Sequence, residues 1–281
     1  MSSLNSIVLK LVLLLLLINL ASFLNIQDAS SSSAPVVETK SGRVQGISQT
    51  LPDGKQVNVF FAIPFAQPPV GELRFKKPIP VERWNGIYLA THNRDSCMQN
   101  LFPDITTSED CLFLNIWQPI KQNITKGKLS VIFWIYGGGF TSGSIFLSIY
   151  SADYLSTLGD VIVVTTNYRL GAFGFLYGGS EDAPGNVGLH DQLLALKWVK
   201  DNIASFGGNP NSITIFGESA GAMSVGAHVL SPLSNGLFQR AIIQSWTPNS
   251  ITASRSKDKS IVITNNLSKS LKCENVSLEE Q

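Results

Sequence analysis

The residues Gly217-Glu-Ser-Ala-Gly221 combine a potential nucleophile with small neighbours. They follow an apolar run at 213–216 and precede a helix-like stretch at 222–230. A Gly-x-Ser-x-Gly turn between a strand and a helix holds its serine in a strained conformation that only small neighbours allow, so the hydroxyl projects free of the sheet. Ser219 is therefore the prime candidate for a catalytic nucleophile.

A nucleophilic serine also needs a base to take its proton and donors to hold the oxyanion that forms. Tyr136 ends an expected strand and is followed by Gly137-Gly-Gly-Phe140, whose backbone amides can approach a ligand because no side chain obstructs them. A triple glycine alone is as often a flexible turn. Its place after a strand and upstream of the serine favours an oxyanion hole, with the amide of Ala220 as a further donor.

The elements around these motifs are expected to alternate between strands and helices. Three apolar, β-branched runs at 131–136, 161–168 and 213–216 lack a clean alternation, which is typical of strands buried on both faces of a mostly parallel sheet. Apolar residues at three- and four-residue spacing predict a helix at 189–205 that stops at Gly207-Gly-Asn-Pro210. This order indicates an α/β domain. Further short strands are predicted at 44–46, 57–63 and 241–244, and prolines exclude a regular helix at 64–80.

Length and composition suit a globular protein. The chain has 281 residues, of which 44% are apolar, and its formal charge of +1 is too neutral to suggest nucleic-acid binding. Residues 11–20 are nearly all leucine, isoleucine and valine, and they lead into a small polar run at 29–34. We interpret residues 1–29 as a signal peptide with an uncertain boundary, and residues 30–281 as a secreted domain. A membrane anchor is disfavoured because the apolar run at 11–24 is shorter than the ~20 residues of a spanning helix.

Cysteines and glycosylation sequons fit the same compartment. Cys97 and Cys111 bracket a polar loop that a disulfide would close in an oxidising environment. Cys273 is left over, and it could be a free thiol, an intermolecular link or the partner of a cysteine outside this sequence. Three sequons, each a weak signal of a secreted surface protein, begin at Asn123, Asn266 and Asn275.

Six ordered blocks of sequence connect the chain to a known family. They are Glu109-Asp-Cys-Leu-Phe-Leu-Asn-Ile-Trp117, Trp134-Ile-Tyr-Gly-Gly-Gly-Phe140, Asn167-Tyr-Arg-Leu-Gly-Ala-Phe-Gly-Phe175, Gly188-Leu-His-Asp-Gln192, Phe206-Gly-Gly-Asn-Pro210 and Phe216-Gly-Glu-Ser-Ala-Gly221. Through these blocks the chain resembles the type-B carboxylesterases and cholinesterases of the α/β-hydrolase fold. The resemblance implies a central, mostly parallel sheet flanked by helices, truncated at the C-terminus.

The resemblance also implies roles for individual residues. Ser219 would be the nucleophile of a carboxylic ester hydrolase that forms an acyl-enzyme with a small-molecule ester, and Cys97 would pair with Cys111. No cofactor is implied, and the histidines and cysteines show no metal-ligand spacing. The oligomeric state is not indicated. The other implied positions are Gly138, Gly139 and Ala220 as the oxyanion hole, Glu218 as a secondary neighbour of the nucleophile, and Ser245 behind the triad acid.

The base is not found where this fold puts it. The triad of the fold runs in the order serine, acid, histidine, yet only His228 follows Ser219, without an Asp or Glu between them. Along one helix, nine residues place His228 about 13 Å from the nucleophile, so we expect it to be a helix-surface or a satisfied core residue. His92 and His190 precede the serine and are expected to be structural.

Family members are roughly twice as long as this chain, so the simplest hypothesis is that it represents their N-terminal half. Cys273 would then open a second disulfide loop. A natural short form without the triad partners is the alternative. In either case the chain should have little activity by itself, and an uncovered sheet edge should lower its stability.

Two aromatic positions bear on the substrate. Family members that hydrolyse acetylcholine place a tryptophan of the first disulfide loop against the quaternary ammonium. The loop at 98–110 has no tryptophan and only Phe102 as an aromatic residue, which favours a general carboxylesterase. Trp246 replaces a family glycine, and it either narrows the acyl pocket or fills core space.

The rival hypothesis is a non-catalytic adhesion or binding protein of the same fold. The intact Gly-Glu-Ser-Ala-Gly motif disfavours it. A sink that is acylated and turns over slowly is the remaining alternative.

Overall fold

The computed structural model describes residues 34–100, 105–120, 127–247, 249 and 254–273. The chain divides into two compact units, Met1–Ala34 and Pro35–Gln281, and the fold described below is that of the second. The predicted signal peptide lies outside the described residues, and so do Asn123, Asn275 and Phe102.

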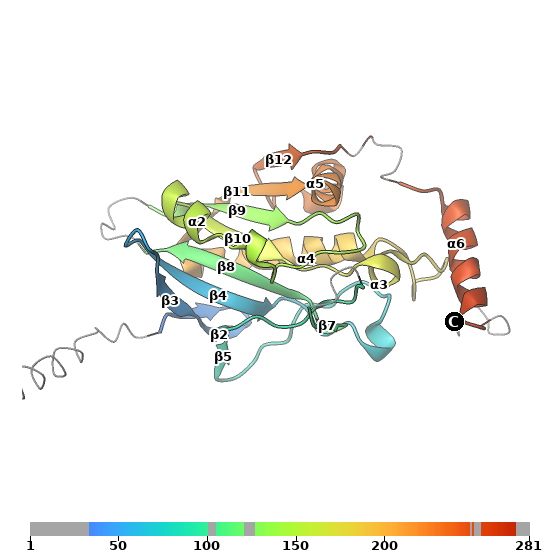
Figure 1. Ribbon diagram of the computed structural model, residues 1–281, viewed down its shortest axis with the longest axis horizontal. Coiled ribbons are helices and arrows are strands. Elements are labelled where there is room, and N and C mark those ends of the chain that lie inside the picture. The colour runs from blue at the N-terminus through green and yellow to red at the C-terminus, as the bar shows by residue number, and fades with distance from the viewer. Residues whose placement is uncertain (1–33, 101–104, 121–126, 248, 250–253, 274–281) are drawn as a thin grey trace, which may run out of the picture. The chain divides into compact units, whose positions relative to one another are not determined.

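A seven-stranded sheet forms the centre of the second unit, in the order β12-β11-β9-β10-β8-β4-β3 (Figure 1). β12, β11, β9 and β10 run parallel to one another, whereas β8, β4 and β3 are added in antiparallel pairings. The sheet is therefore mixed, and its parallel character is confined to four strands. In chain order the strands are β3 (Ile47–Thr50), β4 (Gln56–Pro64), β8 (Phe113–Pro119), β9 (Leu129–Ile135), β10 (Ile162–Thr166), β11 (Gly208–Glu218) and β12 (Arg240–Gln244).

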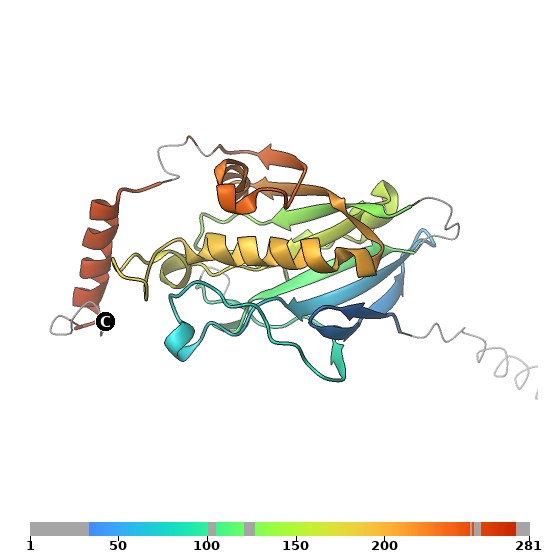
Figure 2. The same cartoon turned by 180° about the vertical axis from the view of Figure 1, so that it is seen from behind.

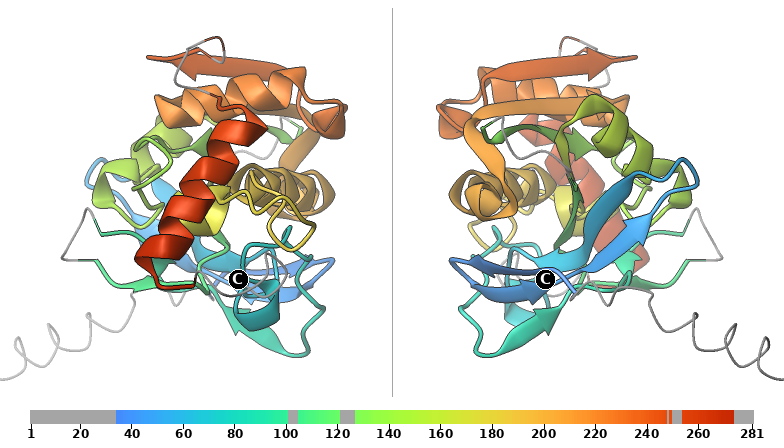
Figure 3. Two further views of the ribbon diagram at one scale, coloured as in Figure 1. Left: turned by 90° about the vertical axis from the view of Figure 1, so that its right-hand side faces the viewer. Right: turned by 90° about the vertical axis from the view of Figure 1, so that its left-hand side faces the viewer.

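Helices cover both faces of this sheet. α2 (Asp153–Gly159) lies on one face and α4 (Val187–Asn202) on the other, as the opposite views in Figures 1 and 2 show. Figure 3, turned by 90°, shows the sheet between these two helices. α5 (Ala220–Leu230) packs beside α4, and Gln192 of α4 donates a hydrogen bond to Ser224 of α5 over 3.1 Å. The other helices of the described residues are α3 (Gly171–Phe175) and α6 (Lys257–Ser270).

Two smaller sheets accompany the central one. β1 (Val36–Thr39), β2 (Gly42–Gln45) and β5 (Ile87–Leu89) form the first. β6 (Ser96–Cys97) and β7 (Thr107–Ser108) form the second, which lies in the disulfide loop. Single 3-10 turns occur at η2 (Gly71–Leu73), η3 (Ser148–Tyr150), η4 (Ile203–Phe206) and η5 (Pro232–Ser234).

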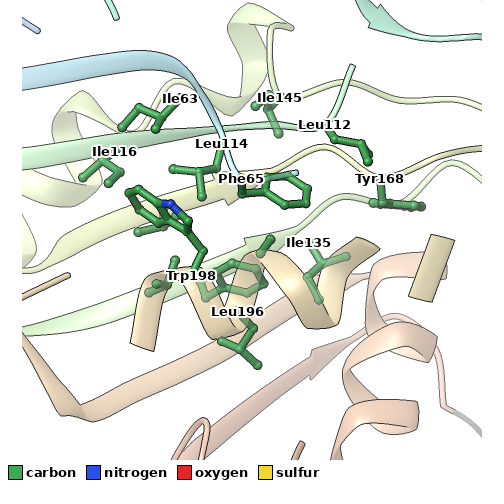
Figure 4. Packing of buried hydrophobic residues seen from close by; sticks show 14 of the residues in the cluster. Ile63, Phe65, Leu112, Leu114, Ile116, Ile135, Ile145, Tyr168, Leu196 and Trp198 are labelled. Atoms are coloured by element: carbon green, nitrogen blue, oxygen red, sulfur yellow. The ribbon is translucent and has the colours of Figure 1, made fainter. Parts of the chain in front are cut away.

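The main hydrophobic core lies between the sheet and α4 (Figure 4). Trp198 of α4 belongs to the same buried cluster as Leu114 and Ile116 of β8. Phe60 of β4 and Phe206 of η4 meet edge to face, with 5.0 Å between their ring centroids. Buried residues of β9, β10 and β11 belong to the same cluster, so the packing holds α4 against both the parallel and the antiparallel strands.

The structure confirms the predicted α/β order and shows which of the predicted strands are buried. The run predicted as a helix at 189–205 forms α4 and η4, and every predicted strand run overlaps an observed strand. β10 is buried along its whole length, as expected for a central strand. The strand predicted at 241–244 is confirmed as β12, the outermost strand of the sheet, and all five of its residues are exposed. None of the helices in the described part of the chain is long and apolar enough to cross a membrane.

Candidate active site

Ser219 lies at the junction of β11 and α5, where the chain turns sharply. Its backbone has φ 55° and ψ −120°, which non-glycine residues rarely adopt. Such a conformation costs on the order of 1–3 kcal/mol. The amide of Ser219 donates to the carbonyl of Gln244 in β12 over 3.0 Å, and the carbonyl of Ser219 accepts from the amide of Met223 over 3.0 Å. Hydrogen bonds on both sides therefore hold the strained turn in place.

Close packing requires the glycines at both ends of the motif. A Cβ atom at Gly217 would collide with Gly221 and would lie 2.9 Å from the amide nitrogen of Ala222. A Cβ atom at Gly221 would lie 2.9 Å from the carbonyl carbon of Ile135 and would collide with its oxygen. The elbow thus touches itself on one side and the end of β9 on the other, and only glycine fits these contacts.

The glycine turn that follows β9 lies beside Ser219. A Cβ atom at Gly137 would be 3.0 Å from the Cβ of Ser219 and 2.9 Å from Oε2 of Glu218. Because β9 and β11 are neighbouring parallel strands, their carboxyl ends carry both motifs to the same edge of the sheet. The structure thereby brings together two predicted motifs that lie about 80 residues apart in the sequence.

Contacts inside the glycine turn orient its peptide planes. The carbonyl of Gly138 accepts hydrogen bonds from the amides of Thr141 and Ser142 over 3.0 and 3.1 Å. A trans peptide directs its N–H opposite to its C=O, and the described residues contain no cis peptide bond, so the amide of Gly139 points out of the turn. Gly138 and Gly139 are both exposed. The turn therefore presents the Gly139 amide on a side that a ligand can reach.

Two buried tyrosines fix the strand ends beneath the site. Tyr136 donates from its hydroxyl to the carbonyl of Tyr168 over 3.4 Å, and Tyr168 donates to the carbonyl of Tyr136 over 2.8 Å. Their rings stack with centroids 4.6 Å apart. Burial raises the pKa of both phenols, so they stay neutral donors. Sequence reasoning missed this pair, although each tyrosine lies in a family block.

A buried ion pair anchors the loop beside the glycine turn. Arg169 donates to Asp191 of α4 from Nε over 2.8 Å and from Nη2 over 2.7 Å, and the two side chains are 3% and 0% exposed. Two residues after Arg169, the amide of Gly171 donates to the carbonyl of Phe140 over 2.8 Å. The ion pair thus connects α4 to the residue that ends the glycine turn. Sequence reasoning assigned neither charged residue a role.

His228 is a satisfied core residue, which is one of its two predicted environments. Its Nδ1 lies 3.0 Å from Oγ of Ser234, and its Nε2 lies 3.1 Å from Oε1 of Gln192. Because Oε1 of a glutamine only accepts, we assign the proton to Nε2 and let Nδ1 accept from Ser234. Burial lowers the pKa of His228 to about 4. A neutral imidazole engaged on both sides is not the base of Ser219.

The hydrogen bonds of His228 continue to the elbow. Nε2 of Gln192 donates to Oγ of Ser224 over 3.1 Å, and that hydroxyl donates to the carbonyl of Ala220 over 3.0 Å. Ala220 directly follows Ser219. The histidine therefore helps to hold the start of α5. Of the remaining histidines, His92 is exposed and His190 is half-buried in α4.

The other predicted residues that are described take varied positions. Cys97 and Cys111 form a disulfide and are both buried, in agreement with the implied pairing. Ser245 follows the end of β12 and is exposed, with φ 67°. Trp246 is 42% exposed, so it does not fill the core of the described unit. Asn266 is exposed on α6.

A sheet whose parallel strands end in a serine elbow and a glycine turn, with helices on both faces, defines an α/β-hydrolase fold. The sequence profile described as "Carboxylesterase family" matches residues 33–281. The chain belongs to this family.

Individual relatives are similar over most of this chain. An acetylcholinesterase of Leptinotarsa decemlineata is 48% identical over 242 residues, which are 76% of this chain and 38% of that protein. An acetylcholinesterase of Danio rerio is 49% identical over 255 residues, with 85% and 39% of the two chains covered. A cholinesterase of Mus musculus is 50% identical over 228 residues, with 76% and 37% covered. The chain thus spans less than half the length of these relatives.

Proposed function

We propose that this chain carries the nucleophile and the oxyanion donors of a secreted serine carboxylic ester hydrolase. One observation carries the proposal: Ser219 is held at φ 55° on the elbow, directly against Gly137 of the glycine turn. Membership in the carboxylesterase family supports the same chemistry. Strain of this kind persists where the surrounding structure fixes it, and it is common at functional sites.

In the proposed reaction, Oγ of Ser219 attacks the carbonyl carbon of the ester and passes its proton to a base. The carbonyl oxygen becomes an oxyanion, which the amides of Gly138, Gly139 and Ala220 would hold. Ala220 opens α5, where the helix dipole favours negative charge. Collapse of the intermediate expels the alcohol and leaves an acyl-enzyme that water hydrolyses.

The base and the acid of the triad are proposed to lie outside this sequence. His228 is the one histidine that follows Ser219, and its two ring nitrogens face Ser234 and Gln192. Without a base, a serine keeps only the small rate that binding and oxyanion donors supply. We therefore expect the 281-residue chain to hydrolyse p-nitrophenyl acetate no faster than its Ser219→Ala variant. Normal turnover by the purified chain would contradict this.

A chimera tests the main proposal. Residues 35–281 would be joined to the remaining C-terminal part of the Danio rerio relative, and a cooperative thermal transition would establish that the product folds. We expect a fluorophosphonate probe to label Ser219 and p-nitrophenyl acetate to be hydrolysed, with both lost in Ser219→Ala. A folded chimera that neither reacts nor labels would favour the non-catalytic binding alternative. Stoichiometric labelling without turnover would favour the slow acylated sink.

The substrate is proposed to be a general carboxylic ester with no choline preference. The names of the relatives above describe cholinesterases, but the disulfide loop at 98–110 has no tryptophan to face a quaternary ammonium. In the chimera, a thiocholine phosphonate and its neutral isostere should label Ser219 at similar rates. A strong advantage of the cationic probe would contradict this proposal.

Secretion and glycosylation are proposed from the leader-like N-terminus and three sequons. The buried disulfide fits an oxidising compartment. Expression of the full sequence in insect cells should yield protein in the medium, and peptide N-glycosidase should lower its apparent mass. Retention of an unglycosylated product inside the cells would contradict both proposals. The sequons begin at Asn123, Asn266 and Asn275.

A further inference from the structure

Gln99 of the disulfide loop makes three hydrogen bonds, two of which reach Gly143 just beyond the glycine turn. Its Nε2 donates to the carbonyl of Gly143 over 2.7 Å, and its Oε1 accepts from the amide of Gly143 over 2.9 Å. The same Nε2 donates to the carbonyl of Cys97 over 3.0 Å. One half-buried side-chain amide therefore pairs with both polar groups of a single backbone residue while it is tied to the disulfide.

Gly143 in turn packs against the start of the glycine turn. It has φ 121°, and a Cβ atom there would collide with the ring of Tyr136 and would lie 2.8 Å from the carbonyl oxygen of Gly137. That carbonyl shares a peptide plane with the amide of Gly138 and points opposite to it. The position of Gly143 therefore influences where the Gly138 amide points.

We propose that Gln99 is a positioning residue of the oxyanion turn. It holds Gly143 against Gly137 and so fixes the Gly138 amide relative to the disulfide loop. The inference rests on the proposed function, because it takes the turn to be the oxyanion hole.

The disulfide loop is a rigid anchor for this connection. Cys97 is 1% exposed and bonded to Cys111, which is fully buried. A second tie runs alongside the first, since Oγ of Ser96 donates to Oγ of Ser144 over 2.8 Å. Two residues close to Cys97, one on each side of it, thus hold two neighbouring residues beyond the turn, and this end of the disulfide loop acts as a scaffold for the candidate site.

Hydrogen exchange of the full 281-residue chain tests the connection without any need for activity. Gln99→Ala should accelerate exchange in peptides that cover residues 137–144 by about tenfold, the equivalent of one to two net hydrogen bonds. Gln99→Glu should behave similarly, because it keeps the shape but loses both donated hydrogen bonds. Gln118→Ala is the matched control: this half-buried glutamine of β8 accepts a hydrogen bond from Asn58 over 3.1 Å.

The outcomes separate positioning from mere packing. Unchanged exchange of the 137–144 peptides in Gln99→Ala or in Gln99→Glu would overturn the proposal. An equally large acceleration in peptides of β10 in Gln99→Ala would also overturn it, because the effect would then not be confined to the turn. In the chimera described above, both variants should also slow fluorophosphonate labelling of Ser219 by about tenfold if the turn holds the oxyanion. Unchanged labelling in a reactive chimera would likewise overturn it. If the parent chimera does not label, the proposed function fails, whereas hydrogen exchange still decides the role of Gln99 in the turn.

Discussion

Acidification should weaken this fold through one buried imidazole. His228 is 5% exposed, and both of its ring nitrogens are hydrogen-bonded in the neutral form. Protonation would place a positive charge in the core, with His190 of α4 as a second titratable group nearby. Burial, and to a smaller extent the charge of His190, therefore lowers the pKa of His228 from the ordinary 6.5 to about 4.

The size of the effect follows from the two pKa values. The unfolded chain binds the proton as the pH falls through 6.5, whereas the folded chain binds it only near pH 4. The contribution of the neutral His228 to the free energy of unfolding is thus fully present above the pKa of the unfolded chain. It is lost as the pH falls toward the pKa of the folded chain. The loss is about 2 kcal/mol at about pH 5 and about 3 kcal/mol once the pH is below both values. A small domain with a total stability of about 5–15 kcal/mol would lose a large share of it.

Urea unfolding followed by tryptophan fluorescence measures this effect, with His228→Gln as the reference because glutamine does not titrate. The difference in free energy of unfolding between the two proteins should fall by about 2 kcal/mol between about pH 7.5 and about pH 5. His190→Gln is the matched control, because His190 is half-buried and its pKa is also lowered by burial. It should remove a smaller share of the pH dependence. A difference between wild type and His228→Gln that stays constant over this range would refute the reasoning.

Three further changes probe the elbow and its support. Ser219→Gly should be about 1 kcal/mol more stable than Ser219→Ala in thermal unfolding, because glycine adopts φ 55° without strain; equal stability would show that the turn is relaxed. Gly221→Ala should lower the free energy of unfolding by about 2–3 kcal/mol in urea, since the new Cβ meets Ile135, and a wild-type urea midpoint would contradict that contact. Arg169→Met should cost about 3–5 kcal/mol by leaving Asp191 unpaired, and adding Asp191→Leu should recover most of it. A double variant as unstable as the single one would argue that the pair is needed for packing.

Patterns that are local in the sequence predicted the secondary structure well. The apolar spacing of 189–205 forms α4 because a helix repeats its buried face every three to four residues. The β-branched run at 161–168 forms β10, which is buried on both faces. The same kind of run at 241–244 forms an exposed strand, because exposure depends on the place of a strand in the sheet order and not on its composition.

By itself, the sequence determined that Ser219 would sit in a strained turn, because Gly217 and Gly221 leave room that larger residues would fill. It also determined that His228 was too far along one helix to serve as its base. Only the tertiary structure decided which distant groups meet at this turn. The order and register of β9 and β11 bring Gly137 to the serine.

The supports of the site were likewise decided by the tertiary structure. Gln99 reaches Gly143, and His228 reaches Gln192, across separations of 44 and 36 residues. Contacts of this kind depend on how helices and loops pack against a completed sheet, and no local periodicity encodes them. The candidate nucleophile is therefore a local property of five residues, whereas the orientation of the amides around it is a property of the assembled fold.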